Sequence, residues 1–168
     1  KTPTTSSTYN MTNYIIIRRN ELQQQIDIRN FYLGEAVKRK DADADTLQSS
    51  TDEKELFSMF LKKALNELIS AVALRFSSIS HRVGKEYVEI TFETQNNSRA
   101  HVLPLLKQAI TDYLVNEVIT EWLLLRQPAM AQPHVARRIS LLQNVQQLLA
   151  KFYNNTHTRR RATDLAGI

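Results

Sequence analysis

The sequence predicts a mainly α fold, a helical bundle of about four helices with a small β element and extended termini. Apolar residues recur at the i, i+3, i+4 spacing of a helix over four long stretches. One short stretch instead alternates apolar and polar residues, which is typical of a half-buried strand. Hydrophobic residues make up 42% and charged residues 23% of the 168 residues, enough for one domain with a real core.

The N-terminal part begins with an arm. Residues 1–13 are rich in Thr and Ser and lack periodicity, so we expect a flexible or extended segment. The apolar run at 14–17 is either a strand or the entry to a helix, and its length does not decide between them. Residues 18–40 follow with helical spacing. Three basic residues in the last turn suit the helix dipole: Lys38, Arg39 and Lys40.

A second helix is predicted over 52–77, after a polar connector. Ser50 and Glu53 form a capping box at its start. Its apolar residues recur at regular helical spacing: Phe57, Phe60, Leu61, Ala64, Leu65, Leu68, Val72 and Phe76.

The small β element is expected at 86–94, where Val88, Ile90 and Phe92 alternate with polar residues. Gly84 supplies turn chemistry before it. A strand needs a partner. That partner is a strand near 81–83, the 14–17 segment or a neighbouring subunit.

Two further helices are predicted at 101–127 and 133–154. Pro104 suits the first turn of the former, Pro128 ends it, and Pro133 starts the latter. The 101–127 helix is apolar over more than half its circumference, so it is central in a bundle or buried by another chain. The chain thus divides into an arm (1–13), an N-terminal helix with an acidic connector (14–50), a helical core with a short strand (51–156) and a C-terminal tail (157–168).

Several classes of function are disfavoured by composition. Cysteine is absent, and the three glycines are too scattered for a phosphate-binding loop. None of the four histidines has metal-ligand spacing, and no nucleophile elbow occurs. We therefore expect no enzyme, no cofactor and no metal. No run of 18 apolar residues exists, so we expect no membrane contact, and no signal peptide is evident.

One acidic segment could bind calcium. Asp41, Asp43 and Asp45 fall at positions 1, 3 and 5 of an EF-hand loop. Thr46 stands where that loop needs Gly, and Asp52 where it needs Glu. A solvated acidic connector that contacts a basic neighbour is the favoured interpretation.

Charge is banded along the chain. Residues 1–40 carry seven basic against three acidic residues, whereas 41–58 carry six acidic against one basic. Opposite bands can pair between copies of one chain, so we assign a set of residues to subunit contacts. The set is Asp41, Asp43, Asp45, Lys38, Arg39, Lys40 and Trp122. For Trp122 core packing is the favoured alternative.

The C-terminal tail combines a basic cluster with apolar residues. Arg159, Arg160 and Arg161 can bind phosphates or remain solvated. Leu165 and Ile168 resemble anchors that dock in a partner's groove. We assign all five to partner binding.

The order of these parts resembles the head–tail connector (adaptor) proteins of tailed phages and prophages, over about residues 52–155. The family's helix near a proline, followed by Leu-Lys-x-Ala-Ile, is matched by Pro104, Leu106, Lys107, Ala109 and Ile110. The closing Leu-Leu-Ala-Lys-Phe-Tyr segment also fits. Residues 122–131 are similar to neck proteins of Bacteroides-type prophages.

The resemblance implies a virion neck protein, assembled in the host cytoplasm as a homo-oligomeric, typically dodecameric ring. Such a ring binds the portal protein and other neck or tail proteins, and lines the channel through which DNA leaves. It meets DNA only non-specifically, and its C-terminal segment docks in the portal. The long helix at 18–40 departs from the family and leaves a stopper or tail-completion protein open. A helical nucleic-acid-binding regulator is the alternative from another class.

Overall fold

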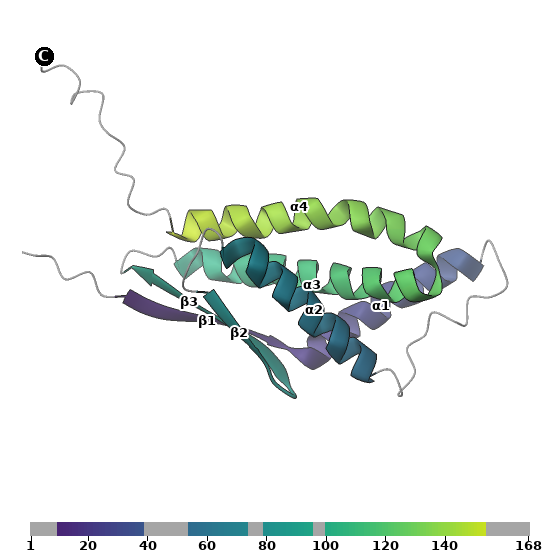
Figure 1. Ribbon diagram of the computed structural model, residues 1–168, viewed down its shortest axis with the longest axis horizontal. Helices are drawn as coiled ribbons and strands as arrows, with labels where there is room; N and C mark the ends of the chain where they lie inside the picture. Colours follow the sequence, from purple (N-terminus) through teal and green to yellow (C-terminus); the bar gives the residue numbers. More distant parts are fainter. Residues whose placement is uncertain (1–9, 39–53, 74–78, 96–99, 154–168) are drawn as a thin grey trace, which may run out of the picture.

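The computed structural model of the protein describes residues 10–38, 54–73, 79–95 and 100–153 (Figure 1). Over these residues the predicted mainly α fold with a small β element is confirmed. The elements in chain order are β1 (Asn10–Arg18), α1 (Arg19–Lys38), α2 (Lys54–Ala73), β2 (Ile79–Val83), β3 (Tyr87–Gln95), a 3-10 turn η3 (Ala100–Val102), α3 (Leu103–Arg126) and α4 (Pro128–Tyr153).

β3 is the central strand of a three-stranded sheet, with β1 and β2 paired antiparallel on its two sides. Two of the three partners considered for this strand, the segments at 14–17 and 81–83, therefore both pair with it. The pairing of β1 starts earlier than expected, at Asn10 opposite Gln95. The last four residues of the predicted arm are thus part of the strand, and residues 1–9 lie outside the described chain.

A tight turn joins β2 to β3 and depends on Gly84. Its backbone N–H donates to the carbonyl of Tyr87 at 2.8 Å. A Cβ at Gly84 would lie 3.2 Å from that same oxygen, so a side chain here would require the Tyr87 carbonyl to shift by a few tenths of an ångström. The turn role predicted for Gly84 is confirmed.

β1 passes into α1 without a linker. Arg19, the first residue of α1, donates its backbone N–H to the carbonyl of Glu86 at 2.8 Å. Its guanidinium donates to the carbonyl of Gly84 at 3.1 Å and to Ser58 Oγ on α2 at 2.5 Å. A single arginine thus joins the strand–helix junction to the β2–β3 turn and to α2.

α3 lies at the centre of the helices and contacts α1, α2, α4 and β1. Figure 1 shows α4 beside α3 along the long axis of the molecule, while α2 crosses α3. All residues from Ala109 to Thr120 are buried except Asp112, which is half-buried. The sequence left two explanations for the wide apolar surface of α3, a central position in a bundle or burial by another chain. The structure shows the central position. Pro104 lies in its first turn, as predicted.

The predicted end of α3 near residue 127 is correct to one residue, whereas the predicted start of α4 at residue 133 is wrong. A single residue, Gln127, separates the two helices, and its backbone N–H donates to the carbonyl of Leu123 at 2.7 Å. α4 therefore begins at Pro128, and Pro133 lies inside it. Pro133 removes the helical hydrogen bond to the carbonyl of Ala129, and its ring crowds that carbonyl. The loss falls close to the start of the helix, where few other bonds depend on it.

The other helices agree with their predicted ranges where they are described. α1 ends at Lys38 and α2 covers 54–73 of the predicted 52–77. The Ser50–Glu53 capping box lies outside the described residues. No helix in the described part of the chain is both long and apolar enough to cross a membrane.

The core lies between one face of the sheet and the helices. Phe92 of β3 meets Phe152 of α4 edge to face, with ring centroids 5.3 Å apart. The predicted alternation is confirmed, because the inward residues of the two longer strands are buried: Ile15, Ile17, Val88, Ile90 and Phe92.

Candidate functional site

Most residues that the sequence assigns to interfaces lie outside the described chain: Arg39, Lys40, Asp41, Asp43, Asp45, Arg159, Arg160, Arg161, Leu165 and Ile168. Lys38 is the last residue of α1. The acidic connector, with calcium binding as its alternative, and the docking tail therefore stay predictions.

Trp122 is packed in the core. Only 5% of it is exposed, and its ring meets Phe60 of α2 edge to face, with centroids 6.2 Å apart. The guanidinium of Arg126 lies 4.6 Å from the Trp122 ring centroid. These contacts show that Trp122 packs in the core, which was the favoured alternative for this residue. Little of the indole is left to contact a neighbouring subunit.

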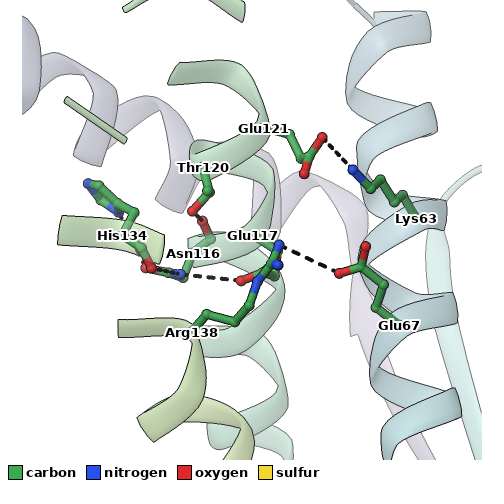
Figure 2. Close-up of polar contacts among 8 residues, drawn as sticks. All are labelled: Lys63, Glu67, Asn116, Glu117, Thr120, Glu121, His134 and Arg138. Carbon is green, nitrogen blue, oxygen red and sulfur yellow. Dashed lines mark hydrogen bonds and ion pairs between the residues drawn. The ribbon is translucent and has the colours of Figure 1, made fainter. Parts of the chain in front are cut away.

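A buried carboxylate, Glu117 in the middle of α3, is the centre of the polar contacts between the helices (Figure 2). It is 1% exposed, and its Oε2 forms an ion pair with Arg138 Nη2 of α4. The same Nη2 lies 3.6 Å from Glu67 Oε2 on α2. The hydrogen bond to Glu117 raises the pKa of Arg138, so this guanidinium remains protonated. One arginine therefore connects three helices.

Asn116, the residue before Glu117, fixes the start of α4 against α3 (Figure 2). Its Nδ2 donates to the backbone carbonyl of His134 at 3.0 Å, and its Oδ1 lies 3.3 Å from His134 Nδ1. The ring donates to Oδ1 in the tautomer protonated at Nδ1. Thr120 Oγ1 donates to the carbonyl of Asn116 at 2.7 Å within α3.

Burial shifts the pKa values of two groups near Glu117 and Asn116. It raises the pKa of the Tyr113 phenol, and the nearby carboxylates of Glu117 and Glu67 raise it further, so Tyr113 stays neutral. Burial lowers the pKa of His134, and the positive charges of Arg137 and Arg29 lower it further. Both groups are therefore held in their uncharged forms.

Two further ion pairs attach α3 to its neighbours. Lys63 Nζ of α2 lies 2.8 Å from Glu121 Oε2, and Arg29 Nη2 of α1 lies 3.2 Å from Asp112 Oδ1. These pairs are more exposed than the Glu117 pair and contribute less than about 1 kcal/mol each. They add to the positioning of α1 and α2 around α3.

The contacts of the polar group around Glu117 are suited to fixing helix positions. A general base must reach the proton that it removes, whereas Glu117 is enclosed and paired with Arg138. Among the residues with described positions, no group of three or more His, Cys, Asp or Glu side chains could hold a metal ion. This group could not be predicted from the sequence, because its members come from three helices. A carboxylate in the middle of a helix that is apolar nearly all round was the available signal.

Two exposed surfaces carry adjacent apolar side chains. The first, the outer sheet surface, is the face of the sheet opposite the core, where Tyr14 is 56% and Ile16 49% exposed. By the strand alternation and register it comprises Thr12, Tyr14, Ile16, Arg18, Ser80, Arg82, Tyr87, Glu89, Thr91 and Glu93. The second, the α1 stripe, comprises Ile28, Phe31 and Tyr32, which are 48%, 54% and 68% exposed. Single exposed apolar residues are ordinary, whereas grouped ones mark contact surfaces.

No family model, curated protein or solved structure matches this chain. Its function is therefore inferred from its own residues and contacts.

Proposed function

We propose that this chain is a non-catalytic structural protein of the phage neck, a ring-forming head–tail connector that attaches to the portal and lines the DNA exit channel. The observation that supports this most directly is the distribution of its side chains. Buried charges are paired between helices, while grouped apolar residues are left on the outer sheet surface and the α1 stripe. A protein whose partners are other proteins needs such surfaces, and a catalyst needs an accessible reactive group instead.

Within this proposal the C-terminal tail attaches the ring to the portal. Leu165 and Ile168 are its apolar anchors, and Arg159, Arg160 and Arg161 lie near the portal or the DNA. Anchors that enter a pocket carry most of the energy of an interface, whereas exposed charges affect mainly association rate and salt dependence. A stopper or tail-completion protein would use the same kind of tail with a different neck partner.

The first experiment measures the assembly state of the full chain. Light scattering and electron microscopy are expected to show closed rings, alone or with the portal protein encoded in the same genome. A chain that stays monomeric at high concentration, and forms no complex with that portal, would overturn the proposal. Specific binding to a DNA duplex by the isolated chain, with a steep salt dependence, would instead favour the nucleic-acid-binding regulator.

The second experiment compares two variants of the tail. Replacement of both anchors, Leu165→Ala with Ile168→Ala, is expected to weaken portal binding about 30-fold, because two pocket-filling side chains are worth about 2 kcal/mol or more. Replacement of Arg159, Arg160 and Arg161 by Ala should mainly reduce the salt dependence of binding. Equal portal binding by the anchor variant and the unaltered chain would contradict this role of the tail.

A further inference from the structure

The outer sheet surface has an apolar centre and opposite charges at its two ends. Tyr14 and Ile16 are adjacent on this face of β1. Arg82 and Glu89 are paired neighbours across β2 and β3, so their charges largely compensate. Arg18 remains at one end of the face, and Glu93, opposite Thr12 of β1, at the other.

β1 is also an unprotected edge strand. It is paired on one side only, in the order β1-β3-β2. Its register with β3 is continuous from Asn10 to Arg18, so no bulge twists the edge away, and Arg18 is its only charged residue. Edge strands that remain exposed usually carry charges, proline or bulges. Within the described residues, β1 therefore lacks the usual protection of an exposed edge strand.

The α1 stripe lies on the side of α1 that faces away from the core. α1 buries Leu22, Ile26 and Asn30 toward α3. Ile28, Phe31 and Tyr32 follow at i, i+3 and i+4 on the opposite side. A helix with one apolar side needs one packing layer, whereas α1 has two apolar sides and only one of them is covered within the described chain.

We propose that the two surfaces are the two halves of one interface between copies, in which the α1 stripe of one subunit packs on the outer sheet surface of the next. The proposal rests on the ring assembly proposed above and names the surfaces that would form it. Packing a helix on the free face would cover the exposed side chains of Tyr14 and Ile16.

Charge supports this pairing. α1 has Glu21 in its first turn, and Arg18 lies at one end of the outer sheet surface. When α1 of one subunit runs antiparallel to β1 of the next, these opposite charges meet.

An interface between two different surfaces is heterologous, so each subunit adds to the next head to tail. Such an interface closes into a ring when the rotation between subunits allows it. A contact of the sheet surface with its own copy would instead stop at a two-fold dimer. The pairing of unlike surfaces is thus the arrangement that a connector ring requires.

A mixing experiment with two variants of the full chain tests the pairing. Ile16→Asp damages the outer sheet surface and Phe31→Asp damages the α1 stripe. Each variant alone is expected to be monomeric by light scattering, because every contact needs both surfaces. An equimolar mixture is expected to form dimers and nothing larger. The intact α1 stripe of the first variant can bind the intact sheet surface of the second, and neither subunit can then add another.

The matched control is Ile139→Asp, at a 63% exposed residue of α4 outside both surfaces, which should assemble as the unaltered chain does. Circular dichroism and thermal unfolding establish that all three variants fold. As a second readout, Arg18→Glu and Glu21→Arg should each weaken assembly about 2- to 5-fold. Their combination should restore it, since exposed pairs contribute up to about 1 kcal/mol.

The outcomes separate this inference from the proposed function. Rings of normal size from both variants would overturn the pairing and leave the connector function standing. The same holds for a mixture that stays monomeric, or for dimers formed by each variant alone. A monomeric unaltered chain, with no portal complex, would overturn both.

Discussion

The polar group around Glu117 buries a charged side chain, whereas the outer sheet surface exposes apolar side chains. Each is the opposite of what is usual for its residue type. Around Glu117 a carboxylate is enclosed between helices and paired with the half-buried guanidinium of Arg138. On the sheet, an isoleucine and a tyrosine of β1 are about half exposed. Charges are rarely buried unless paired, and grouped apolar residues are rarely left exposed unless used. Directional polar contacts thus help to fix how the helices meet, and the exposed apolar residues are the ones that we propose for contacts between molecules.

The two regions should also respond differently to substitution. A buried ion pair contributes little net stability when it is intact, but removal of one partner leaves an uncompensated charge. An exposed apolar side chain contributes little to the fold of its own subunit. Unfolding of single variants can therefore separate the two roles.

The largest effect is expected for Arg138→Met. The variant leaves Glu117 buried beside Tyr113 without its cation, and should reduce the free energy of unfolding by about 3–5 kcal/mol. Urea denaturation followed by circular dichroism measures the change. The double variant Glu117→Leu with Arg138→Met removes both charges and is expected to recover most of the loss. A single variant as stable as the unaltered chain would show that the pair does not position α4.

The second-largest effect is a difference in unfolding free energy between substitutions at two adjacent residues of β1. Ile15 is 3% exposed and faces the core, whereas Ile16 is on the outer sheet surface. Ile15→Ala should cost about 2–5 kcal/mol of unfolding free energy through lost burial and a cavity. Ile16→Ala should cost less than about 0.5 kcal/mol in the assembly-defective Phe31→Asp background, where subunits are separate. Similar losses at both positions would mean that the outer face is covered within the subunit.

A smaller loss is expected at the outer ion pair of α2 and α3. Lys63→Ala removes the partner of Glu121, whose side chain keeps contact with water. The expected decrease in unfolding free energy is about 0.2–1 kcal/mol, and it should shrink further at high salt. A loss as large as that for Arg138→Met would contradict the distinction between buried and outer pairs.

The smallest effect concerns the pH dependence at His134. Its pKa is lowered in the folded chain, first by burial and then by Arg137 and Arg29, so the unfolded chain binds the proton more readily. Stability should therefore fall as the pH drops through the unfolded value of 6.5, until the lowered folded pKa is passed. Unfolding measured between about pH 7.5 and 5.5 should show a weaker pH dependence in His134→Gln than in the unaltered chain. Identical slopes would place the titration elsewhere.

The secondary structure was largely predictable because local patterns determine it. The apolar spacing from Phe57 to Val72 and the alternation from Val88 to Phe92 both gave the correct elements. The start of α4 was not predictable, since Pro133 normally marks a helix start and the Gln127 turn has no glycine. Residues 10–13 of β1 have no apolar alternation, and only their pairing with β3 makes them a strand.

The candidate surfaces were harder to predict than the fold. The sequence identified Trp122 as notable but could not say which apolar residues of a helix remain exposed, because exposure depends on the arrangement of all elements. Ile28 and Leu22 look alike in the sequence, yet one is about half exposed and the other is buried. The contact of Glu117 with Arg138 likewise depends on how closely α4 packs on α3.

The direct passage from β1 into α1 has a consequence for the size of an assembled ring. The strand carries one proposed contact surface and the helix carries the other, and Arg19 fixes the junction through Gly84 and Ser58. The angle between the two surfaces then determines how far each subunit turns from the last, and so the curvature of the whole ring. One residue inserted after Arg19 would rotate the following helix by about 100° and turn its stripe away. In the proposed ring, the diameter would thus depend on a single peptide junction.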